Sequence, residues 1–160
     1  MIAVIQRVTE ARVVVAGSIV GQIGPGMLVL SAVHADDSAD DIVWTANKLV
    51  SLRIFRNGEK HFDYDIRQIK GGILLVSNFT VAGQTRKGRR PSLDAAAPPD
   101  VGGKLFGDLV RAVEALGISV ATGQFGADML VWLANDGPAT FIIDSRESRT
   151  PGAIATGTDR

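Results

Sequence analysis

The chain of 160 residues contains no cysteine and only two histidines, His34 and His61. The lack of cysteine excludes disulfides, thiolate nucleophiles and cysteine-ligated zinc. The histidines show no paired ligand spacing such as H-x-x-x-H, so we expect no metal site. A Ser-His-Asp triad has equally little support, because there is no G-x-S-x-G motif and neither histidine lies near an obvious nucleophile.

Net charge and long apolar runs are also missing. Lys plus Arg and Asp plus Glu both number 17, so a nucleic-acid partner would need a local basic patch. No apolar run is long enough to span a membrane and residues 1–8 do not resemble a signal peptide, so we expect a cytoplasmic protein. Apolar residues still reach 46% with a mean hydropathy of +0.17, which favours an apolar surface buried against another subunit.

Short β-branched segments separated by glycine turns predict that the chain opens as an antiparallel meander. Apolar residues at helical spacing predict two helices, at 39–52 and 105–116, and a continuous apolar run predicts a central strand at 73–76. These elements predict an α/β fold in three layers. Mostly antiparallel strands form two facing sheets or a barrel, and both helices pack on one side. We expect a single domain over residues 1–144, followed at 145–160 by a polar tail that is extended or disordered.

The stretch Asn135-Asp136-Gly137-Pro138-Ala139-Thr140 lies between two apolar runs of strand length. Gly137 can adopt backbone angles closed to other residues, and Pro138 fixes its own φ and can follow a cis bond. Two interpretations remain open for this stretch. It is either a hairpin loop or a rigid pair of carbonyls presented to a ligand.

A second candidate site follows the apolar strand at 73–76. Ser77, Asn78 and Thr80 are small polar residues at its end, where a sheet presents groups to a ligand, although such residues also simply close strands. A long segment from 82 to 99 then carries four positive charges, Arg86, Lys87, Arg89 and Arg90. This run is either a solvated surface or a contact for an RNA backbone.

These stretches resemble a known family. Leu75-Val76-Ser77-Asn78-Phe79-Thr80 is similar to the Ser-Gln-x-Thr motif of the D-aminoacyl-tRNA deacylases, and Phe125-Gly126-Ala127-Asp128-Met129 with the 135–140 stretch resembles their Gly-Pro region. Further matches are Ile5-Gln6-Arg7-Val8, Gly24-Pro25-Gly26 and Lys87-Gly88-Arg89-Arg90-Pro91-Ser92. The resemblance covers residues 1–144. Two departures are Asn78 in place of the usual Gln and Ala139 where Val is common.

The resemblance implies a homodimer, free of cofactors, that hydrolyses the ester joining a D-amino acid to the 3′ end of tRNA. Gly137 and Pro138 would form a cis pair that reaches the neighbouring subunit's site, with Arg7 supporting it. Their carbonyls would exclude an L side chain, while D-residues and glycine would be accepted.

The catalytic residues implied by the resemblance are Ser77, Asn78, Phe79 and Thr80. No base is evident to activate either hydroxyl as a nucleophile. The mechanism that the resemblance implies is hydrolysis assisted by the 2′-hydroxyl of the terminal adenosine, with backbone N–H groups near Phe79 and Thr80 stabilising the oxyanion.

Phe125 and Met129 would hold the adenine unless they are core residues, and the basic run would meet tRNA phosphates. Two alternatives remain, a small-molecule esterase that uses Ser77 or Thr80, and a non-catalytic tRNA-binding dimer.

Overall fold

The main sheet is built on its first strand, which pairs along both of its edges. The computed structural model describes residues 1–149, and there the sheet has six strands: β1 (Ile2–Val15), β2 (Ser18–Ile23), β3 (Gly26–Ala32), β6 (Gly72–Ser77), β7 (Ser119–Thr122) and β8 (Leu130–Asp144). β1 is antiparallel to β2, β3 and β8, whereas β3, β6 and β7 are parallel to one another. The C-terminal ends of β3, β6 and β7 therefore meet at one end of the sheet.

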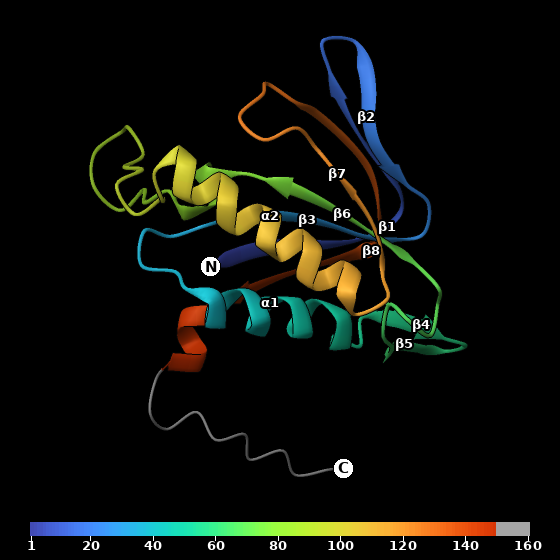
Figure 1. Cartoon of the computed structure of the whole chain (residues 1–160). Coiled ribbons are helices and arrows are strands. Elements are labelled where there is room, and N and C mark those ends of the chain that lie inside the picture. The colour runs from blue at the N-terminus through green and yellow to red at the C-terminus, as the bar shows by residue number, and fades with distance from the viewer. Residues whose placement is uncertain (150–160) are drawn as a thin grey trace.

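Two helices connect the parallel strands and cover one face of the sheet (Figure 1). α1 (Ala39–Ser51) and a small hairpin of β4 (Phe55–Asn57) and β5 (Lys60–Tyr64) lie between β3 and β6, and α2 (Pro99–Ala115) lies between β6 and β7. α1 begins with a capping box of Ser38 and Asp41, in which the Ser38 N–H donates to Asp41 Oδ2 at 2.8 Å. Among residues 1–149, none of the helices combines the length and the hydropathy that a membrane-spanning helix needs.

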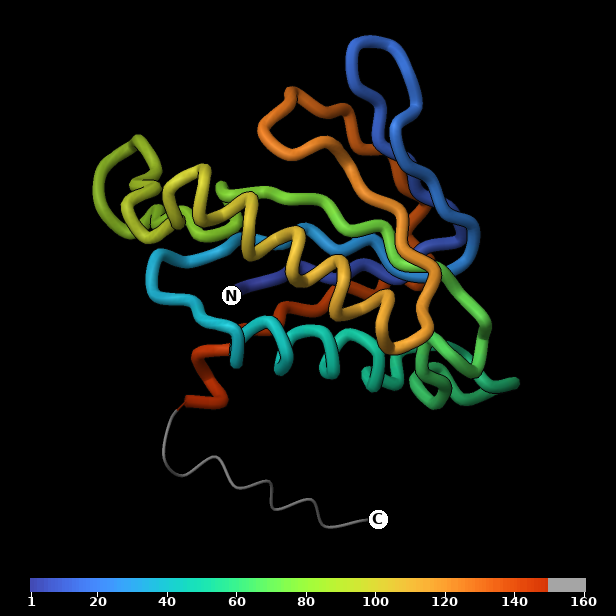
Figure 2. Tube along the Cα trace, viewed as in Figure 1, coloured from blue at the N-terminus to red at the C-terminus, as the bar shows by residue number. Residues whose placement is uncertain are grey.

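Alternate side chains of the central strands feed two apolar cores. Ile73 and Leu75 face the helices, and Leu74 and Val76 face the inside of the curved sheet, as the two-residue period of a strand requires. β2 curls towards β7 so closely that a Cβ on Gly21 would lie 2.2 Å from the Thr122 carbonyl oxygen. The curved, nearly closed sheet, the small second sheet and two helices on one side confirm the predicted fold class (Figure 2).

The predicted meander is wrong, and of the two interpretations of 135–140 the hairpin loop is excluded for a related reason. Residues 2–8 and 11–15 belong to one long strand, and β2 and β3 both pair with it instead of with each other. Likewise, both apolar runs around Gly137-Pro138 belong to β8 and pair with β1. Local composition marks where pairing is interrupted but does not reveal that the same strand resumes.

Within the predicted tail, Ser145–Arg149 forms a 3₁₀ helix, η2, rather than an extended segment, and it lies beside α1 (Figure 1). Ser145 is fully buried, and its Oγ donates to Asp41 Oδ1 at 2.7 Å. The rest of that predicted tail, 150–160, lies outside the described residues. α2 also begins earlier than predicted, because Pro99 suits the first turn of a helix, where its missing N–H needs no partner.

Candidate functional site

A cleft of about 600 Å³ opens at the C-terminal ends of β3 and β6. The end of β6 and the residues after it contribute Ser77, Asn78 and Phe79 to its lining. The opposite walls come from the segment before α2 and from the loop after β7, with Leu93, Ala96, Ala97, Phe125 and Met129. The structure therefore brings most of the predicted catalytic and adenine-binding residues to one cleft.

Asn78 organises the polar side of this cleft. Its backbone N–H donates to the Ser31 carbonyl at 2.8 Å, which continues the pairing of β6 with β3. Its side-chain Oδ1 caps the short 3₁₀ helix η1 (Phe79–Ala82) by accepting from Thr80 N at 3.3 Å and from Thr80 Oγ1 at 2.5 Å. The Phe79 N–H, at the first position of η1, has no partner within that helix.

Phe125 and Met129 line the apolar side of the cleft. Phe125 is 42% exposed and packs on Phe106 with 6.3 Å between ring centroids, so it is a surface residue of the cleft rather than a core residue. Met129 is half-buried, and its sulfur lies 2.6 Å from where a Cβ on Gly123 would stand. An exposed ring beside a soft thioether can accommodate a flat apolar group.

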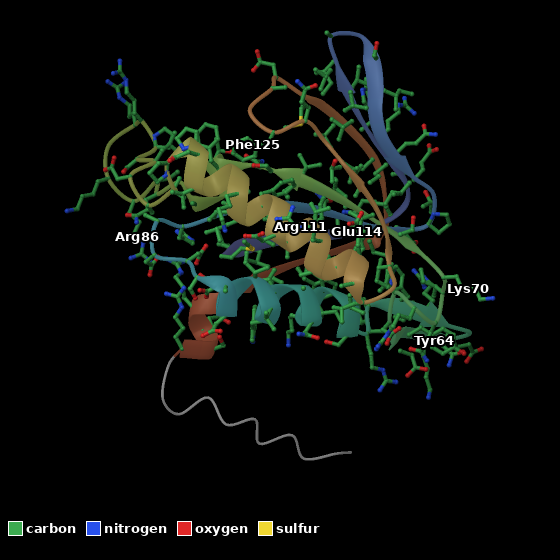
Figure 3. The ribbon with its side chains drawn as sticks, in the orientation of Figure 1. Tyr64, Lys70, Arg86, Arg111, Glu114 and Phe125 are labelled. Atoms are coloured by element: carbon green, nitrogen blue, oxygen red, sulfur yellow. The ribbon has the colours of Figure 1, made fainter. Side chains whose placement is uncertain are left out.

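The basic residues stand at the tip of a loop whose base is paired. Gln84 and Ser92 exchange two backbone hydrogen bonds, of 2.8 and 2.9 Å. All four basic side chains beyond this pair are exposed, namely Arg86, Lys87, Arg89 and Arg90. Figure 3 shows Arg86 and Phe125 at the same end of the molecule. The loop thus places four positive charges near the cleft, so that one polyanion could contact the loop and the cleft at the same time.

Arg7 is buried and fixes the Gly-Pro stretch. It is 2% exposed, and its Nη1 donates to the carbonyls of Ile54 at 2.7 Å and His61 at 3.1 Å. Its Nε donates to the Asp136 carbonyl at 3.1 Å and lies 2.9 Å from Asp136 Oδ2. One guanidinium therefore joins the start of the stretch to two separate segments, which its rigid fork of donors permits.

Gly137 and Pro138 project from β8 as an exposed bulge. β1 and β8 pair at Gln6–Thr140 and again at Val8–Asn135, so residues 136–139 stand opposite Arg7 alone. The Gly137–Pro138 bond is cis, and both residues are exposed. Gly137 has φ +130°, and a Cβ there would lie 2.9 Å from Arg7 Nη2, so the position requires glycine.

Sequence reasoning missed the role of Asn135, whose side chain shapes this bulge. Asn135 Oδ1 accepts from Ala139 N at 3.0 Å, and its Nδ2 donates to Gln6 Oε1 at 2.5 Å and to Thr140 Oγ1 at 3.1 Å. Asn135 therefore closes the bulge across its own base. Its place immediately before Asp-Gly-Pro was a usable signal, because Asn side chains commonly bond the backbone of a turn.

Within one copy of the protein, the bulge and the cleft lie at opposite ends of the main sheet. Arg7 pairs with Met27 at the start of β3, whereas the cleft lies beyond the end of β3 and of its neighbour β6. The ends of a six-residue strand are about 17 Å apart. Tyr64, on the hairpin beside the bulge, and Phe125, on the cleft, lie at opposite sides of Figure 3. The structure does not bring Gly137 and Pro138 to the cleft of their own chain.

Neither histidine lies among the residues that line the cleft. His34 is 3% exposed in the connection between β3 and α1, and His61 lies on β5, where its Nδ1 is 2.7 Å from Arg56 Nη1. Across residues 1–149, no three His, Asp or Glu side chains gather closely enough to hold a metal ion. In the same range, neither Ser77 nor Thr80 bonds a histidine or a carboxylate.

Comparison with known proteins matches residues 4–144 to the family model described as D-Tyr-tRNA(Tyr) deacylase. A protein of Geobacter metallireducens named D-aminoacyl-tRNA deacylase is 53% identical over 145 residues, which are 91% of this chain and 96% of the relative. One of the same name from Geobacter sulfurreducens is 53% identical over 152 residues, 94% of this chain and 100% of the relative. A solved structure titled c-Myc DNA Unwinding Element Binding Protein matches with a TM-score of 0.85 and 30% identity, over 90% of this chain and 98% of that one.

Proposed function

The chain belongs to the D-Tyr-tRNA(Tyr) deacylase family, and on that premise we propose that Gly137 and Pro138 select its substrate by stereochemistry. Its activity is that of a D-aminoacyl-tRNA deacylase, a hydrolase whose substrate is a charged tRNA. The observation that carries the proposal is the buried Arg7, which holds an exposed Gly137–Pro138 bulge. We assign the activity to one domain, residues 1–144, and its place of action to the cytoplasm.

The proposed filter uses main-chain oxygens instead of a side-chain pocket. The carbonyls of Gly137 and Pro138 would lie beside the α-carbon of the bound aminoacyl group, where an L side chain collides with them and a D side chain points away. Such a filter works by excluding the wrong enantiomer. It accepts many D-residues, and it also accepts glycine, because glycine has no side chain to exclude.

The filter must come from a second copy of the chain. The bulge stands at the far end of the sheet from its own cleft, so a two-fold dimer with the copies side by side and reversed would bring each bulge to the partner's cleft. Because a two-fold interface uses the same surface on both copies, one pairing completes both sites. The proposed assembly is a homodimer with two shared sites.

The cleft residues favour water, and not a hydroxyl of the chain, as the nucleophile. Thr80 Oγ1 donates its proton to Asn78 Oδ1 at 2.5 Å, and an amide oxygen is too weak a base to activate a threonine. In the proposed reaction, water attacks the ester carbonyl with help from the 2′-hydroxyl of the terminal adenosine. The C–O bond to the ribose 3′-oxygen then breaks, and that oxygen takes a proton.

The developing oxyanion needs donors that are already in place. The Phe79 N–H has no partner in η1, whereas the Thr80 N–H already donates to Asn78 at 3.3 Å, so Phe79 is the better placed of the two. Ser77 stands beside them in the cleft lining. We propose that Ser77, Asn78 and Thr80 hold this corner of the cleft and that the Phe79 N–H faces the oxyanion.

The tRNA would be held at two places. Phe125 and Met129 would take the adenine of the 3′ end, because an exposed ring and a thioether suit stacking on a base. The exposed loop with Arg86, Lys87, Arg89 and Arg90 would meet phosphates nearby. This division leaves the aminoacyl group at the polar corner formed by Asn78 and Phe79.

The decisive assay follows the loss of D-tyrosyl-tRNA, L-tyrosyl-tRNA and glycyl-tRNA with purified protein. We expect rapid loss of the D-tyrosyl and glycyl esters and sparing of the L-ester. Binding of tRNA without discharge would instead support a non-catalytic dimer, and equal activity on an RNA-free D-tyrosine ester would support a small-molecule esterase. Equal loss of the D- and L-esters would refute the filter.

The mechanism is tested with Thr80→Ala and with a tRNA that ends in 2′-deoxyadenosine. Removal of a nucleophile lowers kcat by about 10⁴-fold or more. We expect Thr80→Ala to stay within about tenfold of the wild type, the range for loss of a positioning hydrogen bond, and the 2′-deoxy substrate to react at least about 100-fold more slowly. Thr85→Ala, an exposed threonine in the basic loop, is the control. A folded, tRNA-binding but inactive Thr80→Ala variant would reject RNA assistance.

A further inference from the structure

One wall of the cleft is attached to the connection between β3 and α1. This wall, residues 93–97, lines the cleft with Leu93, Ala96 and Ala97. Ala97 N donates to the Val33 carbonyl at 2.9 Å, and Ala35 N donates to the Ala95 carbonyl at 3.1 Å. These two backbone hydrogen bonds mean that the position of residues 33–35 determines the position of the wall.

His34 is the side-chain link in this attachment. Its Nδ1 lies 3.2 Å from the Ala95 carbonyl, and since a carbonyl only accepts, Nδ1 carries the proton of this hydrogen bond. The ring is buried, and its Nε2 has no partner in the described part of the chain. The backbone N–H of His34 donates to Asp37 Oδ2 at 2.7 Å, and Asp37 N donates back to the His34 carbonyl at 3.2 Å. The orientation of His34 thus depends on Asp37.

Asp37 is in turn held by Arg149, the last residue of η2. Arg149 Nη2 lies 3.3 Å from Asp37 Oδ1, Nη1 lies 2.9 Å from Asp36 Oδ2, and Nε donates to Asp41 Oδ1 at 3.0 Å. The side chains of Asp37 and Asp41 are 0% and 3% exposed. Buried carboxylates are stable only when a positive group faces them, and here Arg149 serves both, with the Met1 ammonium as a second partner of Asp37.

We propose that Arg149 is a positioning residue for the deacylation reaction, which holds the cleft wall at 93–97 in place through Asp37 and His34. It lies beyond residues 4–144, the part of the chain matched by the family model. The inference rests on the proposed function in one respect, namely that the 3′ end of the tRNA binds in this cleft. A wall that is already fixed lowers the entropic cost of ordering the cleft when tRNA binds. Releasing the wall should therefore raise KM and leave the rate of the chemical step unchanged.

The test compares Arg149→Gln, Arg149→Lys and the control Arg146→Gln. Arg146 also belongs to η2, but within residues 1–149 its hydrogen bonds all go to Asp144, with Nε to Oδ1 at 2.9 Å. For Arg149→Gln we expect amide exchange at Ala35 and Ala97 to be about tenfold faster and KM for D-tyrosyl-tRNA to be about fivefold higher, with kcat within about twofold. Arg149→Lys keeps a positive charge beside the buried carboxylates but cannot reach all three of them, so it should restore part of the wild-type KM and part of the amide protection. Arg146→Gln should change neither quantity.

A second variant, His34→Leu, covers the possibility that Arg149→Gln does not fold. It removes only the Nδ1 link and leaves the contacts of Arg149 with the three carboxylates in place, so it should raise KM and exchange at Ala97 while η2 stays protected. The proposal is overturned if Arg149→Gln is less stable but keeps the wild-type KM and the wild-type amide exchange at Ala97. It is also overturned if His34→Leu folds and keeps both of these values. If wild-type protein fails to hydrolyse D-tyrosyl-tRNA, the proposed function fails, while the exchange measurement still tests the link.

Discussion

Replacing Arg7 by lysine tests whether the buried guanidinium holds the Gly137–Pro138 bulge in its selective position. Arg7 reaches in two directions, from Nη1 to the carbonyls of Ile54 and His61 and from Nε to Asp136. Lysine keeps the charge but carries its donors on a single nitrogen. An ammonium that bonds Ile54 and His61 cannot also reach Asp136, so the bulge loses its anchor while the positive charge stays buried.

The magnitude follows from the hydrogen bonds that are lost. The single N–H of Arg7 Nε is lost, which donates to the Asp136 carbonyl at 3.1 Å and also faces the Asp136 carboxylate at 2.9 Å. A hydrogen bond that involves a charged group is worth about 1.5–3 kcal/mol net, so the loss is about 2 kcal/mol. That energy corresponds to a change of about thirtyfold in the balance between the held and the released bulge. Hydrolysis of L-aminoacyl-tRNA should therefore rise by up to about thirtyfold, since under the proposed filter only the held form of the bulge rejects L-substrates.

The assay measures initial rates on L-tyrosyl-tRNA and D-tyrosyl-tRNA, together with the free energy of unfolding in urea. We expect the D-ester rate to stay within about threefold, because the groups at the cleft are untouched. Arg12→Lys is the matched control, since Arg12 lies on the same strand and stacks on Trp132, with 5.4 Å from Cζ to the ring centroid, and makes no side-chain hydrogen bond within residues 1–149. If Arg7→Lys is less stable by the expected amount and still spares the L-ester completely, Arg7 has no part in stereochemical selection.

Three further predictions concern the basic loop, a buried carboxylate and Gly137. Neutralising Arg86, Lys87, Arg89 and Arg90 should reduce the slope of log affinity for tRNA against log salt by about 3, since each phosphate contact contributes about 0.7 to 0.9; an unchanged slope places the tRNA elsewhere. Burial raises the pKa of Asp41, but hydrogen bonds from Arg149, Ser145 and Ser38 lower it further, to well below its ordinary value of 3.8. Because the folded pKa is the lower one, this stabilisation is present above about pH 4 and is lost as the pH falls. Urea unfolding from pH 6 to pH 2.5 should therefore show a flatter acid limb for Asp41→Asn than for wild type. Gly137→Ala should lose about 1–3 kcal/mol of stability, because alanine is strained at φ +130°; a stability equal to wild type in urea unfolding would show that the bulge rearranges freely.

Sequence reasoning predicted the features that depend on neighbouring residues. The run Ile73–Val76 shows a buried strand because every residue in it is apolar, and its polar end at Ser77 and Asn78 marks the edge where the cleft opens. The interruption at 135–140 was also visible, because Gly and Pro disturb pairing wherever they stand.

What the sequence did not reveal depends on partners that are distant along the chain. An arginine on a strand is ordinarily exposed, and Arg7 is buried only because Ile54, His61 and Asp136 turn their oxygens towards it. The same holds for η2, a short polar segment without helical periodicity. Arg149 is held there by carboxylates more than 100 residues earlier in the chain.

The distance between bulge and cleft makes the two parts separable by mutation. Consider one chain with a ruined bulge and a second chain with a ruined cleft, each inactive or unselective when paired with itself. In a mixed pair of the proposed two-fold dimer, the intact cleft of the first chain would face the intact bulge of the second, so one of the two sites would be whole. When the two defective chains are co-expressed, each mixed dimer should therefore have about half of the selective activity of a wild-type dimer. A monomeric enzyme could not recover activity in this way.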